Sequence, residues 1–562
     1  MKAKEKNITI IVLISLAVLC SLWLIPNGMP YSHDVEYHTS RIIGLTNTIR
    51  NGDFLALIHD MLSGYGYANG LFYSNFFFYI PTFLCLLGMS TLNAYKIFTI
   101  LINIATALTS YFCFKSIIKD NKSTLIATIA YNLSVYRIMA IIVRGACGEL
   151  LAMIFIPVIL LGLYEIIYRD YKKWYLFTIG FVFLLLSHLI TSVLMAVFSF
   201  IIIVINYKRF FKEKDRIKYL IMSGVVGLLL GSFFIFPILE QFVHKSVNIF
   251  AVGSKITKLS KFAVGLFDFL LPLPYSVESI HLLNIGYGFI VLLGIPFLFR
   301  KEKVKKNDEY SFAKILLIIS IVLVIMSTKL FPWNIFETSL SFIQFPWRLL
   351  LYSSTFFPIS IGIYLSYYYS KKNNKRVKII NGICILGVFI LVLTTLAYNF
   401  VFAFVCPRKN VFREKIGLGE YLPAGIDVDS SFIGEPDEGK LDLEVYYDSN
   451  NEELKYKINR KGKDIKIEYS GNKEGTYLEI PVFNYLGYKA EGAKITDGNY
   501  HRMKLLLDNK ESGTVHVYYG MTKVQKVSYA ISFVSLVGVA IYSGIVIMKK
   551  KNKWYNINVK GE

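Results

Sequence analysis

Long apolar stretches alternate with short basic clusters along most of the chain. Stretches of about 20 apolar residues, the length that a helix needs to cross a bilayer core of about 30 Å, recur from about residues 8–28 to about residues 527–548. Lys and Arg gather between the stretches, most densely in YKRFFKEKDRIK, and such clusters mark cytoplasmic loops. The pattern predicts a polytopic α-helical membrane protein with about 12 spans and with both termini in the cytoplasm.

Three segments depart from a simple crossing. One helix over the nearly unbroken apolar run 174–206 would be about 50 Å long, which predicts two short helices that turn near His188 at the outer face. The apolar run from Phe76 to Gly88 is short and contains Pro81, so we expect an interfacial or re-entrant segment. Spans at 124–142 and 148–168 are expected to form a hairpin with VRGACGE at its tip.

The pattern changes to period two over about residues 405–525. Alternating apolar and polar positions in LDLEVYY, LKYKI, IKIEY and KLLLD are separated by Gly, Asn and Asp turns, which predicts an all-β domain resembling a small sandwich. The order of the basic loops places this domain outside the cell. We therefore expect a transmembrane domain over 1–404 with a first outer loop at 29–75, a β domain over 405–525, and a terminal helix with a basic cytoplasmic tail over 526–562.

Composition narrows the classes of function. A hydrophobic fraction of 54% and a mean hydropathy of +0.48 exclude an ordinary soluble protein. The net charge of +22 lies mostly in the loops between spans, where it marks topology, so no nucleic-acid partner is expected. The six cysteines are scattered without metal-ligand spacing and predict neither a zinc site nor a disulfide framework.

Several ionisable side chains lie close together in the segment Tyr31–Phe54, directly after the first span. As a helix, this segment places Asp34, Tyr37, His38 and Arg41 on one face. Apolar residues occupy much of the remaining surface, so we expect the helix to lie flat on the membrane with its polar groups raised.

The topology brings other ionisable side chains to the same membrane surface. Such groups are costly near a bilayer and commonly functional, which makes the set a candidate site: Asp34, Glu36, His38, Arg41, Arg144, Glu149, His188 and Arg348.

Each member of this set also has a purely structural interpretation. Asp34 would cap its helix, Arg144 and Glu149 would tie the hairpin tip, His188 would satisfy a helix break, and Trp347 with Arg348 would anchor at the interface. The lysines of the predicted outer loop 240–281 either attract an anionic head group or belong to a solvated loop: Lys245, Lys255, Lys258 and Lys261.

The order of motifs resembles a known family. An Asp-bearing loop after the first span, a Gly-Asp-Phe turn and an aromatic-Pro segment resemble the start of GT-C membrane glycosyltransferases. More closely, the chain resembles bacterial 6-pyruvoyl-tetrahydropterin synthase-related membrane proteins, through HDVEYHTSRI, NGDF, GYGYANGLFYSNFFFYIP, YNLSVYRIMAIIVRGACGELLA, LLSHLITS, QFPWRLL and GLGEYLP. A pterin synthase would need a histidine metal site in a soluble fold, and the sequence shows neither.

The GT-C resemblance implies an acidic base on the first outer loop and a sugar donor linked to polyprenyl phosphate. By position Asp34 is this base, with Glu36 or His38 as its partner, and His33 stands where the commonest GT-C pattern has a second acid. No cofactor is therefore certain, and a divalent cation is left open. Arg41, Arg144 and Arg348 would stabilise the departing phosphate beside Glu149 and His188.

The leading hypothesis is a cell-membrane glycosyltransferase that transfers a sugar at the outer face. Its partners would be a lipid-linked sugar donor, a cell-envelope acceptor and membrane lipids. The alternatives are a transporter or flippase of lipid-linked intermediates, and a GT-C-like scaffold without catalysis.

Overall fold

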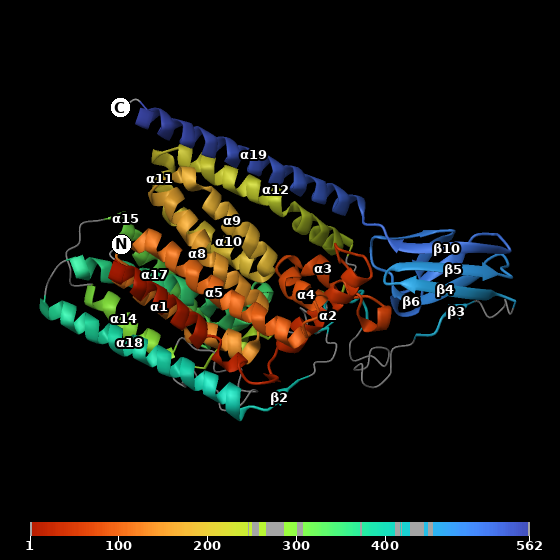
Figure 1. The fold of residues 1–562 in the computed structure, drawn as a ribbon, viewed down its shortest axis with the longest axis horizontal. Helices are drawn as coiled ribbons and strands as arrows, with labels where there is room; N and C mark the ends of the chain where they lie inside the picture. Colours follow the sequence, from red (N-terminus) through yellow and green to blue (C-terminus); the bar gives the residue numbers. More distant parts are fainter. Residues whose placement is uncertain are drawn as a thin grey trace. The chain divides into compact units, whose positions relative to one another are not determined.

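The chain is divided into two compact units. The computed structural model describes residues 3–559 except 245–246, 250–257, 266–285, 300–306, 371–373, 411–415, 418, 427–442 and 448–452. One unit comprises Met1–Tyr219 and Asn248–Leu443, and the other comprises Leu220–Val247 and Glu444–Glu562. Figure 1 follows the chain through both units.

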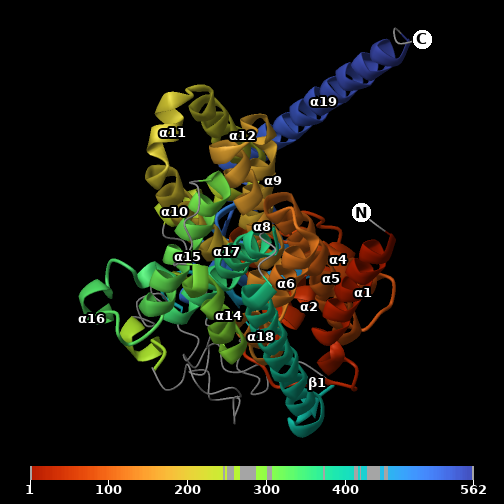
Figure 2. The same cartoon turned by 90° about the vertical axis from the view of Figure 1, so that its left-hand side faces the viewer.

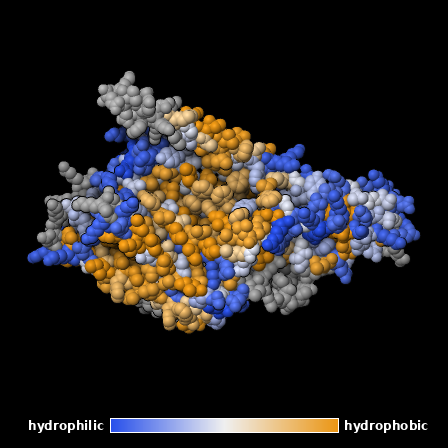
Figure 3. All heavy atoms as spheres, in the orientation of Figure 1, coloured by the Kyte–Doolittle hydropathy of each residue, from blue (hydrophilic) through white to orange (hydrophobic). Residues whose placement is uncertain are grey.

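Apolar helices dominate the first unit and also enter the second. In the described part of the chain, seven helices are long and apolar enough to cross a membrane: α5 (Thr91–Ile118), α8 (Cys147–Tyr168), α12 (Asp215–His244), α15 (Asp308–Met326), Pro346–Ser370 with α17 (Leu350–Ser370), Lys375–Val405 with α18 (Asn374–Phe400), and Lys523–Ile545 of α19 (Lys523–Val559). A pair bent by 40°, Asn121–Asn132 with Val135–Arg144, makes an eighth candidate. Hydrophobic side chains cover much of the surface in Figure 3, as a bilayer requires.

The predicted membrane protein is thus confirmed, but the count of about 12 spans is not. The other four predicted spans correspond to helices with 13 to 17 described residues, fewer than the about 20 that are typical of a crossing: α1 (Ala3–Leu19), α9 (Tyr175–Ser187), α10 (Leu189–Ile205) and α14 (Gly286–Phe299). The predicted span at about 282–299 begins outside the described residues.

One local prediction, the helix break at His188, is confirmed, and the short helix expected around Pro81 is also found, while its interfacial or re-entrant placement stays a prediction. His188 has extended backbone angles (φ −157°, ψ 112°), so α9 ends and α10 begins on either side of it. The segment around Pro81 forms only a short helix, α4 (Tyr79–Leu86), which cannot cross a bilayer.

The helix α2 (Val35–Arg50) departs from its prediction because its polar residues His38 and Arg41 are buried and are not raised from the protein surface. Its hydroxyl side chains donate to carbonyls of their own helix, as Thr39 does to Val35 at 2.8 Å and Thr46 does to Ile42 at 2.7 Å. Satisfied in this way, polar side chains pack against neighbouring helices at little cost.

The buried α17 lies between α15 and α6 (Asn121–Asn132) in the interior of its unit (Figure 2). Most of its residues are buried, on all sides of the helix, which is typical of a helix without a solvent or lipid face. The segment just before it, Pro346–Leu349, enters the site described below.

The C-terminal β region contains two antiparallel four-stranded sheets, ordered β4-β5-β10-β7 and β3-β6-β9-β8. Their strands are β3 (Tyr446–Tyr447), β4 (Lys455–Lys461), β5 (Asp464–Ser470), β6 (Tyr477–Phe483), β7 (Tyr488–Glu491), β8 (Ala493–Asp497), β9 (Arg502–Leu507) and β10 (Ser512–Tyr519). Both sheets contribute to one core, with Ile467 and Val515 from the first and Leu478 and Leu505 from the second. The period-two pattern therefore predicted a C-terminal β-sheet region correctly, and the strands of the two sheets run from Tyr446 to Tyr519 within the predicted 405–525.

Candidate functional site

The turn that precedes α8 places the Arg144 guanidinium against the Glu149 carboxylate. After α7 (Val135–Met139), a π-helical turn (Ala140–Arg144) leads to Gly145, whose φ of 62° is left-handed. A Cβ on Gly145 would lie 2.4 Å from a methyl of Val35, so only glycine allows the turn to approach α2 this closely. The Asp34 amide then donates to the Arg144 carbonyl at 2.8 Å.

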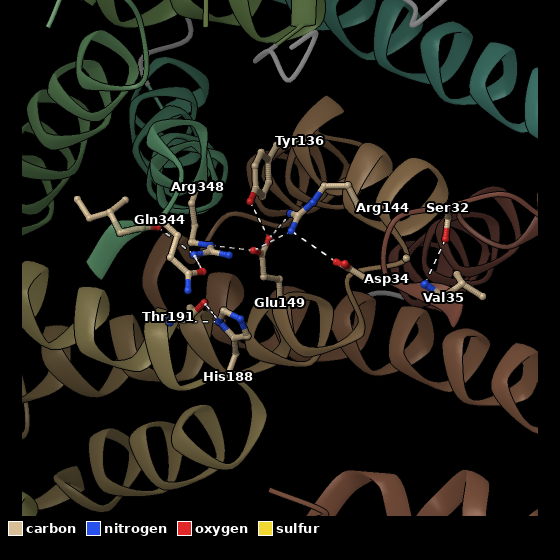
Figure 4. A network of polar contacts seen from close by, with 12 residues as sticks. Ser32, Asp34, Val35, Tyr136, Arg144, Glu149, His188, Thr191, Gln344 and Arg348 are labelled. Carbon is tan, nitrogen blue, oxygen red and sulfur yellow. Dashed lines mark hydrogen bonds and ion pairs between the residues drawn. The ribbon is translucent and has the colours of Figure 1, made fainter. Parts of the chain in front are cut away.

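Glu149 is the centre of the resulting network (Figure 4). Its Oε2 accepts hydrogen bonds from Arg144 Nη1 and from the Tyr136 hydroxyl, both at 2.7 Å. Its Oε1 accepts from Arg348 Nε at 3.0 Å and from Arg144 Nη2 at 3.3 Å. The side chain is only 2% exposed, so these donors replace its water shell completely.

A constrained turn supplies Arg348. Gln344 before it has a φ of 63°, and Arg348 Nη1 donates to the Ile343 carbonyl and the Gln344 side chain, both at 2.9 Å. Arg348 Nη2 has no partner among the described residues. Arg348 and Trp347 are both buried, so the interpretation as an exposed interfacial anchor is wrong. Instead, the Trp347 ring lies 4.4 Å from the Arg144 guanidinium.

Asp34 lies next to this network but is held loosely. Its Oδ2 is 3.8 Å from Arg144 Nη2, and no described residue donates a hydrogen bond to either oxygen. Although Asp34 occupies the cap position of α2, its side chain makes no capping bond, so the capping interpretation is not supported. The side chain is 39% exposed. Desolvation by the surrounding protein raises the pKa of Asp34, and the Arg144 charge opposes this shift.

His188 and Tyr73 border the same space. His188 Nδ1 contacts the Thr191 hydroxyl at 2.7 Å and accepts from the Thr191 amide at 3.3 Å, which leaves the proton on Nε2. The His188 and Tyr73 rings lie 6.1 Å apart. A Cβ on Gly148 would stand 1.6 Å from the Tyr73 hydroxyl, so this glycine makes room for the phenol.

The other predicted site residues point elsewhere. Glu36 pairs with Lys409 at 3.6 Å. His38 is buried among aromatic rings, and this burial and then the Arg41 charge lower its pKa well below its usual value. Arg41 is fully buried, and its Nη2 donates to the backbone carbonyls of Tyr73 and Ser74. Arg41 thus fixes the segment that carries Tyr73.

Sequence reasoning missed Tyr73, Tyr136 and another buried cation, Arg137. Arg137 donates to Asn103 Oδ1 at 2.7 Å and to the Asn132 carbonyl at 3.1 Å, across the break between α6 and α7. An arginine inside the apolar run YNLSVYRIMA was the available signal. Of the lysines in the predicted outer loop, Lys245 and Lys255 lie outside the described residues.

The donor set does not fit a divalent cation. Asp34 offers an open carboxylate, but both oxygens of Glu149 are occupied and two guanidinium groups lie beside them. Within the described residues there is no group of three or more His, Cys, Asp or Glu side chains that could hold a metal ion. The arrangement instead offers N–H donors and positive charge, which suit a phosphate.

Comparison with known proteins identifies the family. The sequence profile described as 6-pyruvoyl-tetrahydropterin synthase related domain, a membrane protein, matches residues 71–404. The chain belongs to this family. The matched range includes Tyr73, Arg144, Glu149, His188 and Arg348 and begins after Asp34.

A relative from Lactococcus lactis subsp. cremoris, named only as an uncharacterized protein, is 22% identical over 344 residues. The match covers 58% of this chain and 54% of that protein. Neither match carries the name of a glycosyltransferase.

Proposed function

We propose that this protein is a GT-C-like membrane glycosyltransferase that transfers a sugar from a polyprenyl-phosphate donor to a cell-envelope acceptor at the outer face. The observation that carries the proposal is that two neighbouring carboxylates differ in their hydrogen bonding and exposure. Glu149 is saturated by Arg144, Arg348 and Tyr136, whereas Asp34 accepts no hydrogen bond from a described residue and is partly exposed. A general base must be free to meet its substrate, and Asp34 satisfies that condition.

In the proposed reaction, Asp34 accepts the proton of an acceptor hydroxyl while the hydroxyl oxygen forms a bond to the anomeric carbon of the sugar. The bond between that carbon and the phosphate oxygen breaks, and polyprenyl phosphate leaves with the electron pair. The donors available for the departing phosphate are Arg348 Nη2, the His188 Nε2 proton and the second N–H of Arg144 Nη2, whose first N–H donates to Glu149. Glu149 holds the two arginines in place, so it supports phosphate binding without touching the phosphate.

The raised pKa of Asp34 suits this role. An ionised carboxylate whose pKa is raised above the ordinary value of about 3.9 is a stronger base. The same proposal places both termini in the cytoplasm and the β region outside the cytoplasm. In this proposal, the β region helps to bind the acceptor.

The test compares wild type with Asp34→Asn, both purified as the full chain and reconstituted in lipid. Each is given a panel of polyprenyl-phosphate sugars, and the release of polyprenyl phosphate is measured. We expect release by wild type and a loss of about 10²- to 10⁴-fold in the variant, the usual contribution of general base catalysis.

Glu36→Gln is the matched control, since Glu36 lies two residues away and pairs with Lys409. It should retain transfer within a few-fold of wild type. Full activity in Asp34→Asn would disprove the assignment of the base. No release by well-folded wild type from any donor would favour the transporter or scaffold alternatives.

A further inference from the structure

An apolar cavity adjoins the arginine network inside the first unit. It has a volume of about 130 Å³ and lies between α7, α14, α15 and α17. Its wall includes the side chains of Tyr136, Phe289 and Phe357. An apolar cavity of about 150 Å³ holds a benzene ring, so this one has room for roughly one isoprene unit.

Four serines line the cavity, and three of them donate their hydroxyls to backbone carbonyls, whereas the buried Ser134 hydroxyl has no hydrogen-bond partner among the described residues. Ser320 donates to the Leu316 carbonyl at 2.7 Å, Ser353 donates to the Ser320 carbonyl at 3.1 Å, and Ser354 donates to the Leu351 carbonyl at 2.8 Å. With these hydroxyls satisfied by backbone, the wall offers mainly carbon to an occupant.

One side of the cavity extends to the exposed side of α15. Ile321 and Ile325 stand one helical turn apart, line the cavity, and are 37% and 46% exposed. The helix α15 is one of the seven candidate spans, so a bilayer would cover this surface. The opening therefore faces hydrocarbon and admits a chain sideways from the membrane.

The other side leads to the phosphate donors through a single side chain. The Tyr136 ring lines the cavity, and its hydroxyl donates to Glu149 Oε2 at 2.7 Å (Figure 4). Glu149 in turn accepts from Arg348 at 3.0 Å. A hydrocarbon site and a cationic site thus lie on opposite sides of Tyr136, which is the arrangement that a phosphate ester of a long hydrocarbon requires.

We propose that this cavity holds the phosphate-proximal isoprene unit of a polyprenyl phosphate whose phosphate contacts Arg348 and Arg144. A narrow cavity accommodates one branched chain, whereas a glycerophospholipid brings two chains and a glycerol linker. The inference rests on the proposed function for its choice of lipid, and it adds the place where the chain enters.

The test uses the full chain in phosphatidylcholine nanodiscs and a polyprenyl phosphate with a photoreactive diazirine in the isoprene unit next to the phosphate. Crosslinked peptides are mapped by mass spectrometry, and binding is titrated. We expect labels on α14 and α15 near Phe289 and Val324, competed by unlabelled polyprenyl phosphate and not by phosphatidylglycerol.

The matched variants are Ile325→Trp, which fills the opening, and Val322→Trp, which is on α15, is 47% exposed and does not line the cavity. Ile325→Trp should weaken binding at least tenfold, and Val322→Trp should leave it unchanged. Normal binding by a folded Ile325→Trp variant, labels elsewhere, or equal competition by phosphatidylglycerol would overturn the inference.

The two proposals fail separately. If wild type releases polyprenyl phosphate but the labels lie outside the cavity, the chain site is wrong and the proposed function stands. If the labels map to the cavity and no donor is ever turned over, the chain site stands and the glycosyltransferase assignment fails.

Discussion

The two ends of α8 carry similar carboxylates in different surroundings. Glu149 lies in its first turn and Glu165 in its last, about 24 Å apart by the rise of an α-helix. Both are almost fully buried, and each lies near two cations. The cations differ, since Arg144 and Arg348 are buried beside Glu149, whereas Arg169 and Lys173 beside Glu165 are about 36% and 43% exposed.

This comparison shows that a buried acid alone does not define a site. At Glu165 the cations reach solvent and the ion pairs tie the end of a helix. At Glu149 the cations are enclosed, one guanidinium nitrogen of Arg348 has no described partner, and a second, loosely held carboxylate lies beside them. The unused hydrogen-bonding capacity distinguishes a site that can bind from one that only stabilises.

The largest expected contrast is in stability. Glu149→Gln should lower the free energy of unfolding by about 3–5 kcal/mol, because two buried guanidinium groups lose their anion. Glu165→Gln should cost about 0–1 kcal/mol, because its exposed cations become hydrated. Thermal unfolding of both purified variants in the same detergent measures the difference, and equal losses would contradict the comparison.

The second contrast concerns phosphate binding. Arg348→Lys keeps the positive charge but removes the guanidinium group, which contacts Glu149 through Nε and has Nη2 available for phosphate. The Kd for polyprenyl phosphate should therefore rise about 10- to 100-fold, as for loss of a hydrogen bond to a charged group. Arg169→Lys at the other end of α8 is the control and should bind like wild type. An unchanged Kd in a folded Arg348→Lys protein would remove Arg348 from the site.

The third contrast separates charged from neutral acceptors. Tyr136→Phe removes a donor to the Glu149 carboxylate at 2.7 Å, and Tyr168→Phe removes one to the Asn206 amide at the same distance. The first should destabilise by about 1.5–3 kcal/mol and the second by about 0.5–1.5 kcal/mol. Chemical denaturation in detergent tests this order, and a larger loss in Tyr168→Phe would reverse the argument.

The smallest contrast is a pH shift. Asp34 acts as a base only when ionised, so its raised pKa should place the acid limb of kcat/KM above the ordinary Asp range near about 3.9. The folded state also favours protonated Asp34, so stability should fall as the pH rises from the ordinary pKa to the raised one. A folded Arg144→Gln protein should move the acid limb higher still, because Arg144 lowers this pKa. A limb at the ordinary position in wild type would argue against Asp34.

Part of the site was predictable from topology alone. The expected gathering of Asp34, Arg144, Glu149, His188 and Arg348 is observed (Figure 4). Each of these residues lies at or next to a helix end or a helix break, and such ends come together where the chain turns between packed helices. Glu36, His38 and Arg41 were not separable from this group by sequence, since neighbours on one short helix differ only in which packed element they face. Tyr136 and Tyr73 could not be predicted from the sequence, because tyrosine is common in this chain. Only the packing places these two tyrosines next to the polar groups of the site.

The sequence by itself determined the class of the protein and the nature of its C-terminal region. Apolar length and period-two alternation are local properties, so they predict membrane helices and a two-sheet β region without knowledge of the packing. Tertiary structure decided how many helices are long enough to span, that α2 is buried, and that Glu149 is saturated while Asp34 is not. Those outcomes depend on which donors reach each carboxylate in space, and that is set by contacts between residues far apart in the chain, such as Glu149 with Arg348.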